Sequence, residues 1–99
     1  MSADTPNSQP SGPDPDKFRT LRSKLEVFHD WPHPYLFKFI VPRARQEELE
    51  AVFEGWEYRT RASRNGSWIS LTCERVMESA DAVIDVYERV DGIEGAFAL

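Results

Sequence analysis

Apolar and polar positions alternate along two runs that flank Asn65-Gly66, from about residue 56 to residue 76. Asn-Gly between two alternating runs is typical of a β-hairpin with a type I′ turn, because both central positions of that turn need a positive φ. Such a turn pairs the residues from Arg59 opposite Thr72 through Ala62 opposite Ile69. The sequence therefore predicts a hairpin with a defined register.

The predicted register separates two kinds of side chain, because residues in a strand alternate between faces with a period of two. One face is largely apolar and comprises Tyr58, Thr60, Ala62, Ile69, Leu71 and Cys73. The other comprises Glu57, Arg59, Arg61, Ser63, Trp68, Ser70, Thr72 and Glu74. A register shift of one residue would mix the two sets, so this separation supports the turn assignment.

Three segments have the spacing of amphipathic helices. The first covers about residues 17–27, with Asp16 as a possible N-cap and a stripe of Phe18, Leu21, Leu25 and Phe28. The second runs to about residue 54, with Leu49, Val52 and Phe53 facing inward, and Gly55 stops it. The third begins at the N-cap Ser79, carries a stripe of Ala80, Val83, Val86, Tyr87 and Val90, and stops at Gly92.

Residues 35–41 read as a first strand with apolar residues on both faces, which is typical of a central strand. Residues 93–99 read as a short last strand. The resulting order predicts a ferredoxin-like βαββαβ fold of the α+β class, with a four-stranded antiparallel sheet, two helices on one face and a short additional N-terminal helix. We expect residues 1–16 to be a disordered tail, residues 17–34 to form the N-terminal helix and a proline-containing connector, and residues 35–99 to form the domain.

Composition narrows the possible functions. The chain has 99 residues, a net charge of −5 and one cysteine. The negative charge makes nucleic-acid binding unlikely, and the single cysteine fits a reducing compartment. Neither a signal peptide nor a membrane-spanning run is apparent, so we expect a cytoplasmic protein without a membrane partner. A domain this small has little surplus stability, which makes a homodimer plausible.

Two stretches of the sequence resemble a known family. They are Asp30-Trp31-Pro32 with the strand Tyr35-Leu36-Phe37-Lys38-Phe39-Ile40-Val41, and the run from Ser63 to Thr72, which has the pattern Ser-x-Asn-Gly-x-aromatic-x-Ser-x-Thr. They resemble the YbeD-like family (domain of unknown function 493) over about residues 28–99. The resemblance implies a ferredoxin-like fold similar to ACT-type regulatory domains, which bind amino acids, and it implies no reaction. ACT domains usually carry a glycine-bearing loop after the first strand, where this chain has Pro42-Arg43-Ala44-Arg45.

The polar face of the sheet is the candidate binding site. Its candidate residues are Lys38, Arg59, Arg61, Trp68, Ser70 and Thr72. An aromatic ring with cations and hydroxyls can hold a carboxylate, a phosphate or an acidic strip on a partner. The alternative is a solvated or dimer-covered face on which Arg59 pairs with Glu57 or Glu74.

Other chemistry is weakly indicated. His29 and His33 have a helical metal-ligand spacing, but Pro32 lies between them, so we predict no metal site. Cys73 falls on the apolar face, where we expect it to be buried and unreactive. No catalytic triad, nucleotide-binding glycine loop or Cys-x-x-Cys motif is visible, so we expect neither enzymatic activity nor a cofactor.

These features favour a non-enzymatic regulatory or protein-interaction domain that self-associates. Its expected partner is a second copy, giving a homo-oligomer, or another protein. The alternative function is a sensor that binds a small anionic metabolite or an amino acid on the open face of the sheet.

Overall fold

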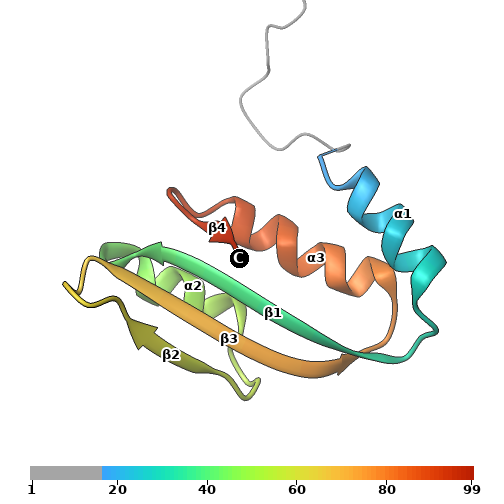
Figure 1. Cartoon of the computed structure of the whole chain (residues 1–99), viewed down its shortest axis with the longest axis horizontal. Helices are drawn as coiled ribbons and strands as arrows, with labels where there is room; N and C mark the ends of the chain where they lie inside the picture. Colours follow the sequence, from blue (N-terminus) through green and yellow to red (C-terminus); the bar gives the residue numbers. More distant parts are fainter. Residues whose placement is uncertain (1–16) are drawn as a thin grey trace, which may run out of the picture.

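The computed structural model describes residues 17–99, so the predicted tail and its Asp16 cap lie outside the described residues. The elements in chain order (Figure 1) are α1 (Arg19–Phe28), β1 (His33–Pro42), the 3₁₀ turn η1 (Arg43–Arg45), α2 (Gln46–Val52), β2 (Arg59–Ala62), β3 (Trp68–Met77), α3 (Ala80–Asp91) and β4 (Phe97–Ala98). Residues 17–99 form an α+β structure with one antiparallel sheet and three α-helices.

The sheet has the strand order β2-β3-β1-β4. Its two central strands pair along their whole length, from His33 opposite Met77 to Pro42 opposite Trp68. The edge strands are much shorter, since β4 contributes only Phe97 and Ala98. The long β1–β3 ladder therefore forms the centre of the sheet (Figure 1).

The hairpin register confirms the predicted pairing, with Arg59 opposite Thr72 and Ala62 opposite Ile69. The predicted type I′ turn centred on Asn65 and Gly66 was wrong. The Gly66 N–H donates to the Ser63 carbonyl at 2.9 Å, which centres the turn one residue earlier, and Gly66 follows it with a φ of 78°.

The Asn65 side chain explains this turn. Its Oδ1 atom accepts hydrogen bonds from the Ser67 N–H at 3.0 Å and from the Ser63 hydroxyl at 3.1 Å. The loop therefore holds four residues between Ser63 and Trp68, and these two still face each other through a 2.8 Å bond from the Ser63 N–H to the Trp68 carbonyl. Both turns leave Ser63 opposite Trp68, so the register survives the change.

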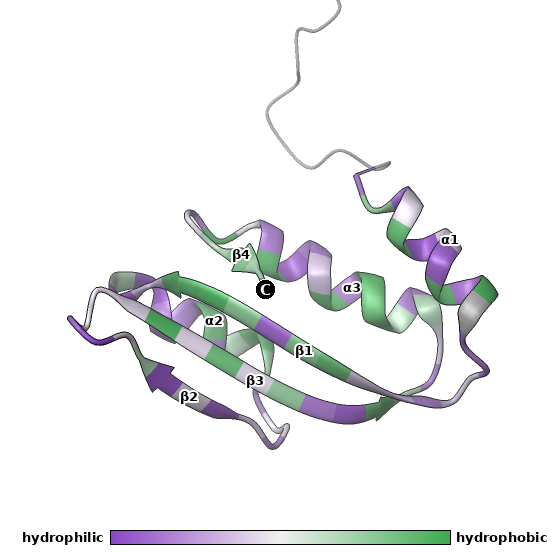
Figure 2. Ribbon diagram, viewed as in Figure 1, coloured by the Kyte–Doolittle hydropathy of each residue, from purple (hydrophilic) through white to green (hydrophobic). Residues whose placement is uncertain are grey.

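One face of the sheet is covered by helices and holds the core. The strands contribute the buried side chains Phe37, Phe39, Val41, Ile69, Leu71 and Cys73. The helices and the turns that follow them contribute Leu49, Phe53, Val83, Ile84, Val86, Val90 and Ile93. Figure 2 shows the apolar positions that recur along β1 and β3. No polar side chain among the described residues is buried in this core.

Two predictions were wrong at the edges of the sheet. Thr60 and Ala62 were expected on the covered face, yet both are exposed, because α2 is short and lies against β1 and β3. The last strand was predicted over residues 93–99, but Ile93 is buried in the turn after α3. Gly95 then passes Pro42 with a φ of 81°, and pairing with β1 begins only at Phe97.

Helix α1 packs on α3 of the same chain. The Phe18 ring lies 5.8 Å from the Tyr87 ring, and Leu25 is buried. Ion pairs join Lys17 to Asp91 and Arg22 to Asp81 at the two ends of α3. Phe18, Leu21 and Leu25 of the predicted stripe thus add to the helical layer, and the opposite face of the sheet receives no cover from them. The side chain of Phe28, the last residue of that stripe, lies outside the described part of the chain.

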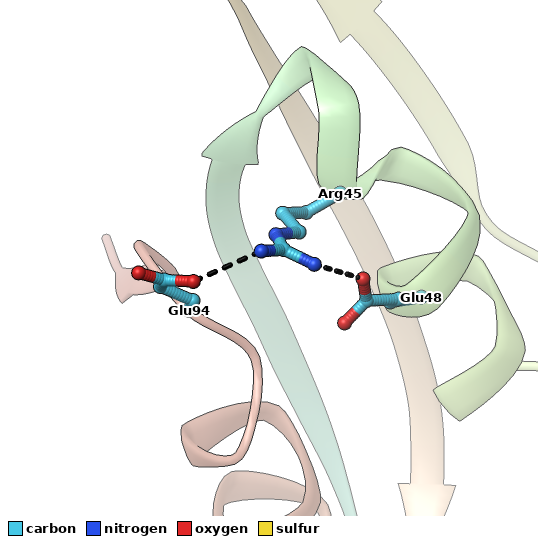
Figure 3. A network of polar contacts seen from close by, with 3 residues as sticks. All are labelled: Arg45, Glu48 and Glu94. Atoms are coloured by element: carbon cyan, nitrogen blue, oxygen red, sulfur yellow. Dashed lines mark hydrogen bonds and ion pairs between the residues drawn. The ribbon is translucent and has the colours of Figure 1, made fainter.

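A polar contact joins the start of α2 to the loop before β4 (Figure 3). The Arg45 guanidinium donates to Glu48 at 2.7 Å and to Glu94 at 2.9 Å. The two carboxylates, Glu48 foremost, raise the pKa of Arg45 above its ordinary value. All three side chains are solvent-exposed, so the contact positions the loop more than it stabilises the fold.

Candidate functional site: the open face of the sheet

The side of the sheet away from the helices is called the open face here. Directly opposed residues of antiparallel strands point to the same side. The pairing of Lys38 with Thr72 and of Thr72 with Arg59 therefore gives one row of three polar side chains across β1, β3 and β2. The neighbouring row runs from Phe97 through Ile40 and Ser70 to Arg61.

All six predicted site residues lie on this face. Lys38, Arg59 and Thr72 form the first row, and Arg61 and Ser70 belong to the second. Trp68 stands at the end of β3 beside the second row, with its ring 6.0 Å from that of Phe97. The structure thus brings together the whole set that the alternation of the hairpin predicted.

Two adjacent hollows mark the face. One has a volume of about 460 Å³ and is lined by Ile40, Arg61, Ala62, Ser63, Arg64, Trp68 and Ser70. The other has a volume of about 400 Å³ and is lined by Leu36, Lys38, Arg59, Thr60, Arg61, Ser70 and Thr72. Arg61 and Ser70 line both, so the two hollows are adjacent, and together they are called the depression of the open face.

The cations of the open face are free to bind a partner. Within residues 17–99, the side chains of Lys38, Arg59 and Arg61 make no hydrogen bond or ion pair. The alternative pairing of Arg59 with Glu57 or Glu74 is therefore absent, although these carboxylates line a hollow beside it. On this face, the Ser70 hydroxyl donates a hydrogen bond to the backbone carbonyl of Arg61 at 3.3 Å, which leaves the Arg61 guanidinium uninvolved.

Of the large apolar side chains at the two ends of this face, sequence reasoning named only Trp68 as a site residue. Leu36, Trp68, Val76 and Phe97 are large apolar side chains with at least 36% of their surface exposed, and the strand pairing places all four on the open face. Trp68 and Phe97 lie near one end of the β1–β3 ladder, and Leu36 and Val76 lie near the other. A signal was available for Leu36, because it shares the strand face of Lys38. Phe97 could not be placed without the β4 pairing.

The connector before β1 gathers His29, Trp31 and His33. The centroids of the two imidazole rings lie 4.4 Å apart, although the two residues share no helix, since α1 ends at Phe28 and His33 begins β1. The indole Nε1 atom of Trp31 is buried and has no hydrogen-bond partner in the described part of the chain. Among residues 17–99, no group of three or more His, Cys, Asp or Glu side chains could hold a metal ion.

Cys73 lies where the apolar face predicted it. Its side chain is buried against the helices, and this burial raises the pKa of the thiol. A buried thiol with a raised pKa has little reactive thiolate. Tyr87 behaves similarly, because burial and the 3.0 Å contact with the Tyr35 hydroxyl raise its pKa above the ordinary tyrosine value.

Comparison of the chain with family models, curated proteins and solved structures gave no significant match. In the part of the chain that the structure describes, no helix has the length and hydrophobicity needed to cross a bilayer.

Proposed function

We propose that the chain is a small non-enzymatic protein-interaction domain with a regulatory role, and that the open face is its contact surface. One observation carries this proposal: the open face combines exposed large apolar side chains with three cations that have no ion-pair partner among residues 17–99. Exposed apolar surface grouped on one side of a small domain is typical of a binding surface. Arginine and aromatic residues are also enriched where protein contacts are strongest.

We further propose that the fold is ferredoxin-like and ACT-like. The element order β1-α2-β2-β3-α3-β4 and the sheet order β2-β3-β1-β4 support this proposal, as does the resemblance to the YbeD-like family between Ser63 and Thr72. In this reading, α1 is an addition that packs on α3.

Another protein fits this face better than a second copy does. Two open faces in contact would bring Lys38, Arg59 and Arg61 of both copies together. Extension of the sheet through two β2 edges would place Arg59 opposite Arg61 of the partner, and like charges directly opposite each other are destabilising. Self-association, and with it the homodimer, remains the competing form of the proposal.

The second candidate function is a sensor for a small anionic ligand. It is favoured by the depression of the open face, where Arg61 and Ser70 line both hollows. A thermal-shift panel of amino acids and phosphorylated metabolites would show a stabilising ligand whose effect Arg61→Ala removes. A flat panel argues against this candidate.

The interaction proposal is tested with matched charge reversals. Arg61→Glu changes the open face, and Arg89→Glu makes the same change on an exposed position of α3. In quantitative affinity capture from cell extract, the proteins retained by the wild-type chain should be lost with Arg61→Glu and kept with Arg89→Glu. Equal capture by all three chains would refute the open face as the contact surface. Light scattering across micromolar concentrations reports on self-association in the same samples.

A further inference from the structure

We propose that the open face receives an acidic amphipathic α-helix of another protein, laid along β3. This inference rests on the proposed function and names the chemistry of the partner. The partner helix carries carboxylates at its middle, facing Arg59, Arg61 and Lys38, and apolar side chains at both ends.

Charge supports the acidic middle. The chain as a whole carries a net charge of −5, yet the two central rows of the open face hold three cations and no carboxylate. The acids beside these rows are Glu74, one row further along β3, and Glu57, which lines the same hollow as Arg59. A partner that covers the face must supply negative charge, because cations that lose water without a counter-charge are costly.

The positions of the apolar side chains set the length of the partner. Trp68 and Val76 are eight residues apart on β3, which corresponds to about 26 Å at 3.3 Å per residue. An α-helix rises 1.5 Å per residue, so about 18 residues reach from one apolar end to the other. Phe97 widens the contact beside Trp68, and Leu36 widens it near Val76.

Sheet geometry favours a helix over an added strand. Strand addition needs a free edge strand. The edge strand β2 has only four residues, and two of them are Arg59 and Arg61. Short, charged edge strands disfavour pairing with another chain. The unoccupied surface is a face of the sheet, and a sheet face is normally covered by a helix or a second sheet. A small ligand in the depression would contact the sheet on one side only, so much of its surface would stay in water.

The rows also predict the order of charges along the partner. Successive rows lie about 6.6 Å apart, which is four to five residues of a helix. Counted from the turn that covers Trp68, acids in the second and third turns meet Arg61 and Arg59. A base in the fourth turn meets Glu74, and apolar residues in the fifth turn meet Val76.

The acidic helix of a second copy matches this description poorly. Helix α3 has exposed carboxylates at Asp85 and Glu88, but it has 12 residues and spans only about 18 Å. Its Asp81 is already paired with Arg22 of α1, and its Asp91 with Lys17 just before α1. The partner is therefore a longer helix from a different protein.

The test uses the full chain and a synthetic helical peptide of about 19 residues, with leucines in its first and last turns, glutamates in the second and third, and lysine in the fourth. A second peptide of the same composition exchanges the leucines with the glutamates. Fluorescence anisotropy should show that the first peptide binds at least tenfold more tightly and that high salt weakens this binding. Arg61→Glu should weaken it on the order of tenfold, and Arg89→Glu by less than about twofold.

A charge swap makes the result specific. A peptide with lysines in place of the central glutamates should prefer the double variant Arg59→Glu and Arg61→Glu over the wild-type chain. Equal affinity for the patterned and rearranged peptides would overturn the helix proposal, as would equal binding by the wild-type chain and Arg61→Glu. Self-association of the wild-type chain would also overturn the helix proposal if Asp85→Lys abolishes it. The occupant of the open face would then be a second copy. If the peptide fails while capture from extract still depends on Arg61, the interaction function stands and only the helical partner is wrong.

Discussion

The two faces of the β1–β3 ladder use the same backbone and alternate residues of the same strands, yet they have opposite chemistry. On β3, Ile69, Leu71 and Cys73 are buried under helices, whereas Ser70 and Thr72 between them face solvent. The covered face contains no buried polar side chain among the described residues. The open face mixes cations, hydroxyls and large exposed apolar groups.

This difference indicates that one face of the sheet serves stability and the other serves binding. The covered face already has its second layer, so its side chains contribute to stability by burial. None of the described helices or strands forms a second layer on the open face, and its exposed apolar side chains add little to the stability of the free chain. Changes on the covered face should therefore alter folding, and changes on the open face should alter binding while the fold persists.

Thiol labelling should show the largest contrast between the faces. Cys73 lies on the covered face, and Thr72→Cys in a Cys73→Ser background places a thiol one residue away on the open face. The introduced thiol should react with a small disulfide reagent roughly a thousandfold faster, since Cys73 reacts only when the structure opens and opening of a core costs several kcal/mol. The rates are measured in buffer at neutral pH.

Denaturant provides the control for this comparison. In urea high enough to unfold both chains, the two thiols should react at similar rates, because the difference comes from the fold. Similar rates in buffer would show that the helices do not shield β3, and the distinction between the faces would fail.

Stability should show the next largest contrast. Leu71→Ala removes a fully buried side chain from the covered face and should lower the free energy of unfolding by about 3 kcal/mol. Leu36→Ala removes the same atoms from a side chain that is 53% exposed on the open face, and it should cost less than about 1 kcal/mol. Urea denaturation monitored by circular dichroism measures both. A loss of 3 kcal/mol for Leu36→Ala would mean that the open face is covered in solution, as it would be in a stable homodimer.

The contrast between the faces was predictable from sequence because strand periodicity depends only on local geometry. A period of two sorted Arg61 and Ser70 from Thr60 and Leu71 as soon as the hairpin register was assigned, and the structure confirms that register. The covering of the central strands followed in the same way, since Phe37 and Phe39 alternate with Lys38.

The edges could not be predicted because they depend on how far the helices reach. Thr60 lies on the strand face that points toward the core. No local signal, however, shows that α2 is too short to cover β2. Phe97 joined the open face through pairing with Ile40, a contact between residues 57 positions apart. Of the apolar part of the candidate site, Trp68 was predicted from the hairpin, whereas Phe97 depended on this long-range pairing.

The turn that holds the two strands in register gives the smallest and most specific test. Gly66 has a φ of 78°, and a Cβ atom there would lie 3.2 Å from Nη1 of Arg43, so Gly66→Ala should cost about 1–2 kcal/mol. Gly55→Ala is the matched control: it has a φ of 85° with no atom near the added Cβ, and it should cost about 1 kcal/mol from backbone strain alone.

Asn65→Gly separates this turn from a type I′ turn. A type I′ turn would accept glycine at position 65 at no cost, because that position has a positive φ. Here the substitution removes the Oδ1 acceptor of the Ser67 N–H and should cost about 1 kcal/mol. Urea denaturation measures all three variants. A neutral or stabilising Asn65→Gly would place the turn one residue later, while the register that puts Arg59 and Arg61 on the open face would stay the same.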